Sequence, residues 1–134
     1  MTDQAPALAA AASGFFDSFV EAFQSFEGTR IAALYLVPSV ALQADGSLGC
    51  LTSQADVARY FQALVDDYRA QGCRACRYRD LEVAAIGARS ALATVTWDLL
   101  DDEGKALKSW RESYNLHRTD AGPWRIFASA DHAD

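Results

Sequence analysis

The stretch LKSWRESYNLHR, residues 107–118, decides the fold, because apolar and polar side chains alternate along it with the period of a β-strand. Trp110, Tyr114 and Leu116 would share one face of that strand. Glu112 would lie on the same face, between the two aromatic side chains. The stretch therefore predicts a long strand with one face turned toward an apolar interior, and with a carboxylate on that face.

Three further runs in the C-terminal half alternate in the same way and predict strands over residues 78–86, 91–100 and 124–130. The connections between consecutive runs are short and contain Gly, as at Gly87-Ala88. Two consecutive parallel strands need a crossover of a dozen or more residues between them. The second half of the chain therefore predicts an antiparallel sheet.

The N-terminal half shows helical periodicity instead. Apolar side chains recur at helical spacing over residues 15–26 and again over 57–68. Ser53 and Asp56 resemble a capping box at the start of the second helix. The stripe on the first helix is aromatic, and such stripes belong to protein cores more often than to ligand sites. Helices followed by a strand meander predict the α+β class.

Two shorter features lie between these helices. Thr29 is suited to cap a short helix over residues 30–36. Asp45-Gly46 is a strong turn signal and predicts a hairpin between strands at 40–43 and 48–51.

The composition limits the domain organisation and the partners. The chain has 134 residues, 51% of them hydrophobic, which suits one domain with its own core. We expect residues 1–12 to be a flexible or partly helical tail and residues 13–134 to be a single domain. The net charge of −6 disfavours nucleic acid and anionic membranes as partners. No basic segment precedes the alanine-rich start and no run of ~18 apolar residues occurs, so we expect a cytoplasmic protein.

The three cysteines include a CxxC, formed by Cys73 and Cys76. A redox CxxC usually begins a helix, whereas this one follows a predicted helix and enters a predicted strand. Residues three apart in a strand point to opposite faces, so this pair is poorly placed for a disulfide or a shared metal. Structural or incidental cysteines are the favoured interpretation, and we expect neither a metal nor another cofactor.

The layout resembles the NTF2-like superfamily, which includes ketosteroid isomerase-like and SnoaL-like proteins. The resemblance rests on three parts of the chain and covers roughly residues 13–132. These parts are AALYLVPSV at 32–40, the helix start SQADVARYF at 53–61 after the hairpin, and SYNLHR at 113–118 with GPWRI at 122–126.

The resemblance implies a cone-shaped, cystatin-like fold, in which a curved antiparallel sheet wraps around the N-terminal helices and encloses a cavity. It also implies a homodimer formed through the outer face of the sheet. Members use the cavity for different chemistries, and some have none, so the fold does not name a function. The sequence contains no P-loop, GxGxxG, HExxH or nucleophile elbow.

Glu112 is the main candidate for catalysis. A carboxylate in an apolar cavity has a raised pKa and can act as a general acid or base near neutral pH. The hydroxyls of Tyr114 and Tyr35 are candidate donors to a developing oxyanion. Two alternatives stay open for Glu112, which are an ion pair with Arg30 or Arg111, and a position at a solvated strand end.

The other candidate residues would bind a ligand. Phe19, Trp97 and Trp110 would supply apolar walls. His132 shares parity with Trp124 and Ile126 in the last strand, which places it on the cavity side.

Asp98, by contrast, should face outward as a surface or interface residue, because the apolar residues of its strand alternate with it.

Two functions are compatible with this pattern. The first is a SnoaL-like pocket protein of isomerase, cyclase or dehydratase type, which moves a proton on a small apolar cyclic or polyketide-like molecule without a cofactor. The second is a module that binds a small molecule or a partner without turnover.

Overall fold

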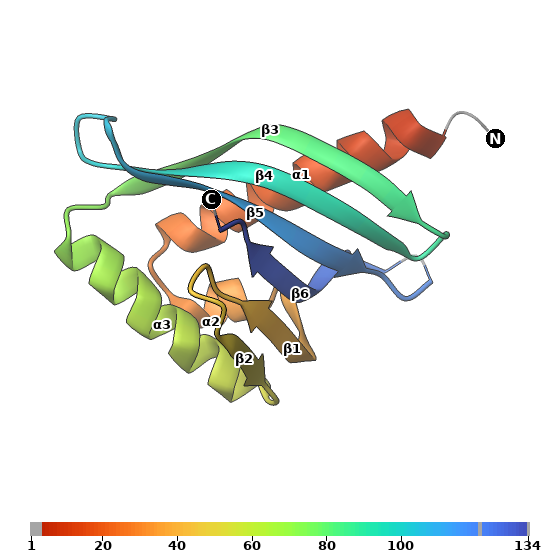
Figure 1. Ribbon diagram of the computed structural model, residues 1–134, viewed down its shortest axis with the longest axis horizontal. Helices are drawn as coiled ribbons and strands as arrows, with labels where there is room; N and C mark the ends of the chain where they lie inside the picture. Colours follow the sequence, from red (N-terminus) through yellow and green to blue (C-terminus); the bar gives the residue numbers. More distant parts are fainter. Residues whose placement is uncertain (1–3, 121, 134) are drawn as a thin grey trace.

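The computed structural model describes residues 4–120 and 122–133, and the chain folds into three helices and one curved sheet of six strands (Figure 1). The helices are α1 (Gln4–Gln24), α2 (Gly28–Ala32) and α3 (Gln54–Ala70). The strands are β1 (Tyr35–Leu42), β2 (Leu48–Leu51), β3 (Ala75–Ile86), β4 (Ser90–Leu100), β5 (Ala106–His117) and β6 (Arg125–Asp131). The α+β class is therefore confirmed.

The sheet has the order β2-β1-β6-β5-β4-β3. Consecutive late strands pair antiparallel, as their short connections require. The one parallel pair joins β1 to β6, which are far apart in the sequence. The three helices lie on one side of the sheet, with α1 along the long strands β3, β4 and β5 and α3 beside the β1–β2 hairpin (Figure 1).

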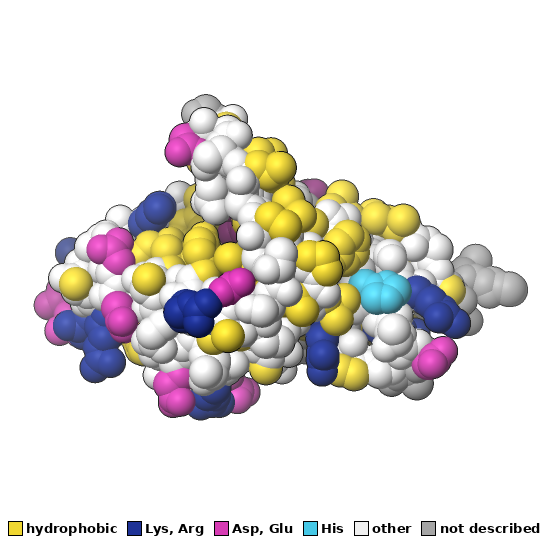
Figure 2. All heavy atoms as spheres, turned by 90° about the horizontal axis from the view of Figure 1, so that it is seen from below, with side chains coloured by type: hydrophobic (Ala, Val, Ile, Leu, Met, Phe, Trp, Pro, Cys, Tyr) yellow, Lys and Arg dark blue, Asp and Glu magenta, His cyan; other side chains and the backbone are white. Residues whose placement is uncertain are grey.

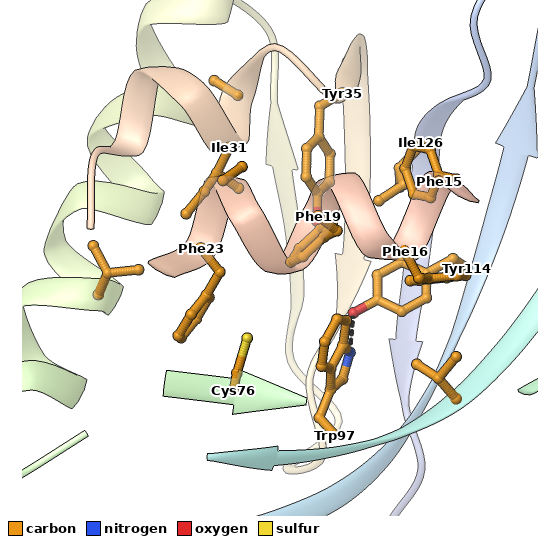
Figure 3. Packing of buried hydrophobic residues seen from close by; sticks show 14 of the residues in the cluster. Phe15, Phe16, Phe19, Phe23, Ile31, Tyr35, Cys76, Trp97, Tyr114 and Ile126 are labelled. Atoms are coloured by element: carbon orange, nitrogen blue, oxygen red, sulfur yellow. Dashed lines mark hydrogen bonds between the residues drawn. The ribbon is translucent and has the colours of Figure 1, made fainter. Parts of the chain in front are cut away.

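The aromatic stripe of α1 forms the centre of the core (Figure 3). Phe16 is fully buried, and its ring centroid lies 5.6 Å from that of Tyr78, 6.0 Å from Trp97 and 5.5 Å from Tyr114. Edge and tilted contacts of this kind are the favoured geometries between aromatic rings. The stripe thus packs one helix against three neighbouring strands.

The short segment between α1 and β1 differs from its sequence prediction. The helix there is α2, its N-cap is Glu27 rather than Thr29, and β1 begins at Tyr35, inside the range predicted as helical. Position 28 requires glycine, because a side chain there would collide with the backbone oxygen of Ala58 on α3. The first residue of α2 therefore packs closely against α3. Ser53, in contrast, caps α3 as predicted and accepts the Asp56 N–H at 3.1 Å.

One β-bulge decides which side chains of β6 face the helices. Asn115 pairs with Ala128 and Leu116 pairs with Ile126, so Phe127 is the extra residue on β6. A single extra residue reverses the alternation beyond it. Ile126 is buried in the core, and after the bulge the odd-numbered positions of β6 face the helices.

Asp98 lies on the outer face of β4, as its parity predicts, but it is only 1% exposed. Its carboxylate accepts hydrogen bonds from Arg77 Nε at 2.7 Å, Arg79 Nε at 2.9 Å and the Ser109 hydroxyl at 2.5 Å. The prediction that Asp98 is a surface residue is therefore wrong, because two arginine side chains from β3 cover it. Alternation along a strand identifies the face, whereas burial depends on the neighbouring strands.

All three cysteines are free thiols, and Cys73 and Cys76 are buried. Burial raises the pKa of Cys76 to about 12, so its thiol stays protonated near neutral pH. Among the described residues, no helix is both long enough and apolar enough to cross a membrane.

Candidate functional site

A cavity of about 400 Å³ lies between the helices and the concave face of the sheet. Its walls are mainly aromatic and its opening is polar. Figure 2 shows the molecule from below, where hydrophobic side chains gather around a hollow and most charged side chains lie toward the margins. The residues that carry its polar chemistry are Tyr35, Tyr68, Lys108, Glu112, Tyr114 and Asp131.

The alternation of β5 turns Trp110, Glu112 and Tyr114 toward the cavity. The indole Nε1 of Trp110 donates a hydrogen bond to Glu112 Oε1 at 2.9 Å. Burial among aromatic side chains and, to a smaller extent, the neighbouring Asp131 carboxyl group together raise the pKa of Glu112 to about 7, against the opposing hydrogen bonds from Trp110 and Tyr114. Glu112 can therefore hold or release a proton near neutral pH.

Neither arginine that could have neutralised Glu112 does so. Arg111 points to the outer face, where it donates to Thr96 Oγ1 at 3.0 Å and lies 3.5 Å from Glu82 Oε1. Arg30 is exposed on α2 and does not line the cavity. No basic side chain among the described residues lies within ion-pair distance of the Glu112 carboxylate. Of the two alternatives from the sequence, the pairing with these arginines is therefore wrong, and burial excludes the solvated strand end.

Asp131 is the important residue that the sequence analysis missed. It lies directly opposite Glu112 in the β5–β6 ladder, and both side chains line the cavity. Counting alternate residues from Ile126 places Asp131 on the outside, but the extra residue Phe127 reverses that order. The sequence carries no signal for this bulge, so pattern alone could not have found the second carboxyl group.

His132 lines the edge of the cavity, although the bulge reverses the parity from which this position was predicted. Its imidazole Nε2 is 2.9 Å from the hydroxyl of Ser113. Ser113 faces outward, where its hydroxyl is also 2.7 Å from Thr94 Oγ1. His132 therefore lies at the rim of the cavity, and its role in binding a ligand stays a prediction.

The two candidate tyrosines reach the cavity from different strands. Tyr114 on β5 accepts a hydrogen bond from the indole Nε1 of Trp97 at 2.7 Å (Figure 3). Burial and the nearby charge of Glu112 hold the pKa values of Tyr114 and Tyr35 well above the ordinary range. Both hydroxyls therefore keep their protons and can act as hydrogen-bond donors.

The hydroxyl of Tyr35 differs from that of Tyr114 in having no partner. Tyr35 is only 6% exposed and lines the cavity. Gln54 bonds to its backbone oxygen, but its hydroxyl has no hydrogen bond to any described residue. A buried polar group usually has a partner, so this hydroxyl is available to a molecule in the cavity.

The three candidate wall residues all line the cavity. The rings of Phe19 and Trp97 pack with centroids 5.2 Å apart, and Tyr35 lies 6.5 Å from Phe19. Trp110 forms the opposite part of the wall beside Tyr68, at 6.4 Å. These aromatic faces form a slot suited to a flat apolar molecule.

The opening of the cavity is lined by charged side chains, in contrast to its aromatic walls. Lys108 extends from β5 and places its ammonium 5.7 Å from the ring centre of Tyr68 and 5.2 Å from that of Trp110. Asp67 on α3 also lines this end. Among the described residues, no group of three or more His, Cys, Asp or Glu side chains is placed to hold a metal ion.

Known structures share this architecture at low sequence identity. An NTF2-like protein with a cystatin-like fold from Novosphingobium aromaticivorans is 16% identical, with a TM-score of 0.73 over 98% of this chain and 88% of that one. The protein Aln2 from a Streptomyces species is 14% identical, with a TM-score of 0.75 over 96% and 92% of the two chains.

The yeast UBP3-associated protein BRE5 is 11% identical, with a TM-score of 0.72 over 95% and 98% of the two chains. Similarity at these identities establishes the fold and not an activity. No sequence among curated proteins matches the chain.

A family model gives the stronger result. The model described as NTF2-like protein (DUF6841) matches residues 9–134, which is nearly the whole chain. The match agrees with the N-terminal helices and the curved six-stranded sheet of the described residues. The chain belongs to this NTF2-like family.

Proposed function

We propose that the cavity binds a small, largely apolar molecule and that Glu112 moves a proton on it without a cofactor, in a reaction of the isomerase, cyclase or dehydratase type. One observation carries the proposal. The carboxyl group of Glu112 is buried among aromatic side chains without an ion-pair partner among the described residues, and its pKa is raised to about 7. A structural carboxylate would be paired, as Asp98 is on the other face.

The simplest step of this type is the isomerisation of a β,γ-unsaturated ketone. The ionised carboxylate of Glu112 removes a proton from the α-carbon, and the C–H electron pair forms a dienolate with its negative charge on the former carbonyl oxygen. The protonated carboxyl group then returns the proton to the γ-carbon, and the carbonyl is restored in conjugation. A positioned acid or base of this kind contributes about 10²- to 10⁴-fold in rate.

The tyrosines would stabilise the oxyanion in this step. Tyr35 has an unoccupied hydroxyl in the cavity, and it can donate to the oxygen on which charge develops. Tyr114 accepts the Trp97 indole N–H, which orients its own hydroxyl in the cavity. Phe19, Trp97 and Trp110 would hold the ring of the substrate between them.

The experiment uses a β,γ-unsaturated cyclohexenone, whose conversion to the conjugated enone is followed by ultraviolet absorbance. Wild type should accelerate the conversion, and Glu112→Gln should lower the rate by about 10²-fold or more, because an amide cannot exchange a proton with carbon. The matched control is Glu103→Gln in the exposed turn between β4 and β5, which should retain the wild-type rate.

Equal rates for wild type and Glu112→Gln would contradict the catalytic proposal. If both proteins bind the ketone but neither converts it, the cavity belongs to a non-catalytic binding module, which is the alternative function. Binding is measured separately by quenching of tryptophan fluorescence, since Trp97 and Trp110 line the cavity.

We also propose that two copies associate through the outer face of the sheet. Leu92 on β4 and Phe127 on β6 are exposed on this face. Both strands pair with β5 at Asn115, so the two side chains lie on either side of that residue. Apolar side chains gathered on an exposed face are typical of interaction surfaces. Light scattering should give twice the chain mass of 14.6 kDa, and Leu92→Lys should reduce it to the single mass. A monomeric wild type at micromolar concentration would contradict this proposal.

A further inference from the structure

The charges that line the cavity are predominantly negative. Glu112 and Asp131 lie opposite each other on β5 and β6, and Asp67 lies near the opening on α3. Lys108 is the one lysine or arginine among the described residues that line the cavity. Three carboxyl groups thus face one ammonium group, and the two deeper carboxyl groups are not within ion-pair distance of it in the described structure.

The aromatic walls already attract a cation. The ammonium of Lys108, an exposed residue, lies over the rings of Tyr68 and Trp110 at the opening. A positive charge within about 6 Å of an aromatic ring centre is attracted by the negative face of the ring. The same wall continues inward through Trp97 and Phe19 toward the two carboxyl groups.

A third polar group points into the same space. Tyr35 is a buried residue that lines the cavity, and its hydroxyl has no hydrogen bond to a described residue. It lies close enough to Glu112 for the carboxylate charge to raise its pKa. Its oxygen can accept a hydrogen bond from an N–H group held between Glu112 and Asp131.

We propose that the cavity selects an organic cation, a molecule with an apolar ring and a protonated amine, whose N–H groups bind Glu112, Asp131 and the Tyr35 hydroxyl. This inference rests on the proposed function, because it specifies the molecule that the same cavity takes. The ring packs in the aromatic slot, and the ammonium supplies the positive charge that the carboxyl groups of Glu112 and Asp131 lack. An anionic ligand is disfavoured, since it would enter a negatively charged site.

The binding should depend on pH. Near neutral pH Glu112 is partly protonated, because burial and, to a smaller extent, the neighbouring Asp131 carboxylate raise its pKa to about 7. A bound ammonium favours the ionised form of Glu112, so binding releases that proton. Affinity for the amine should therefore rise with pH until Glu112 is ionised.

Other titratable groups surround the pair on every side. They are Tyr35 on β1, Tyr60, Asp67 and Tyr68 on α3, Cys76 on β3, Lys108 and Tyr114 on β5, and His132 after β6. The pKa values of Tyr35, Tyr68, Cys76 and Tyr114 are all raised, so these groups stay protonated and uncharged near neutral pH. The imidazole of His132 bonds Ser113 on the outer face. Glu112 is thus the group in the cavity whose raised pKa of about 7 gives the binding its pH dependence near neutrality.

The experiment compares three probes that share a ring and differ in charge, namely naphthylethylamine, naphthylethanol and naphthylacetate. Isothermal titration calorimetry measures their binding at about pH 6 and about pH 8, where an alkyl amine keeps its proton. At the higher pH the amine should bind at least about tenfold more tightly than the alcohol, and the acetate should bind most weakly. The amine should also bind more tightly at the higher pH than at the lower.

Variants then identify the groups responsible. Glu112→Gln and Asp131→Asn should each abolish the preference for the amine over the alcohol, while thermal melts show that both variants remain folded. Glu103→Gln, in an exposed turn away from the cavity, is the matched control and should keep the preference. Two variants on different strands keep the test decisive if one of them fails to fold.

Three results would overturn the inference. They are an alcohol that binds as tightly as the amine, an amine preference that persists in Glu112→Gln, and failure of all three probes to bind. Failure of the proposed function is separate. An enone assay without turnover, together with amine binding, would leave a cation-binding cavity, whereas turnover without amine preference would leave the acid–base role of Glu112 intact.

Discussion

Asp98 and Glu112 lie on adjacent strands, and both carboxyl groups are largely removed from water, but they face opposite sides of the sheet. On the outer face, hydrogen bonds from Arg79, Ser109 and Arg77 hold the pKa of Asp98 well below its usual range. On the inner face, burial raises the pKa of Glu112 to about 7, and the indole of Trp110 donates a hydrogen bond to it without neutralising its charge. The same chemical group is therefore permanently ionised on one face and poised to exchange a proton on the other.

The difference shows that burial alone does not decide the role of a carboxylate. Both groups lose hydration, but only Asp98 is compensated by positive charge. A carboxylate whose charge is compensated by arginines holds neighbouring strands together. A buried carboxylate without such compensation lowers the stability of the folded protein, so a structural role does not explain its presence. Uncompensated burial of this kind is characteristic of functional sites.

The largest expected effect on stability comes from removing the charge of Asp98. Asp98→Asn should lower the free energy of unfolding by about 2–3 kcal/mol, since charge-assisted bonds to two arginines are lost. The value stays below that of a fully buried pair because Arg77 and Arg79 are about half exposed and can return to water. Urea denaturation at neutral pH measures the difference.

Asp80 provides a control for the prediction at Asp98. Asp80 also binds Arg79, at 3.1 Å, but it is exposed. Asp80→Asn should therefore change stability by less than about 0.5 kcal/mol. A loss at Asp80 equal to that at Asp98 would show that burial of the carboxylate is not what makes the outer pair important.

Glu112→Gln should have a smaller effect of the opposite sign. The folded pKa of Glu112 lies above its unfolded value, so the folded state binds the proton more strongly and loses stability as pH rises from about 4.5 to 7. Glutamine removes this loss and can still accept the Trp110 N–H. The change in pKa corresponds to at most ~3.4 kcal/mol, and the partial exposure of Glu112 to solvent reduces this value. The variant should therefore match wild type below about pH 4 and be more stable by about 2 kcal/mol above pH 7.

Denaturant melts of the two proteins across this pH range make the measurement. If the variant is instead less stable than wild type at pH 8, Glu112 is a structural residue and the contrast with Asp98 disappears.

The smallest predicted effect concerns Asp131, whose negative charge raises the pKa of Glu112 less than burial does. Asp131→Asn should lower the pKa of Glu112 but leave it above the ordinary value, because burial is the larger cause of the shift. The test compares the Asp131→Asn protein with the double variant that also carries Glu112→Gln. The pH at which Glu112→Gln begins to stabilise the protein should be lower in this pair than in the pair without Asp131→Asn. An unchanged pH would show that the two carboxyl groups do not interact.

The alternation of β5 was sufficient to predict which face Glu112 occupies. Residues 107–118 pair without a bulge from Trp110 to Asn115, so parity holds through Trp110, Glu112 and Tyr114. The sequence also predicted the α+β class, because helical and strand periods are segregated along the chain. These features depend on local spacing, which a single sequence contains.

The features that were missed depend on contacts between strands. The bulge at Phe127 places Asp131 at the cavity, and nothing in the spacing of β6 indicates it. The burial of Asp98 requires Arg77 and Arg79 to lie against it from β3. Long-range pairing of this kind is determined by the whole fold, so single-sequence patterns do not contain it.

The central claim is that Glu112 titrates near neutral pH inside the cavity. Carbon NMR of protein labelled at the glutamate carboxyl carbons measures this directly, with Glu112→Gln identifying the resonance. We predict a titration midpoint of about 7 for Glu112. A midpoint near 4.5, the ordinary value for glutamate, would contradict the account.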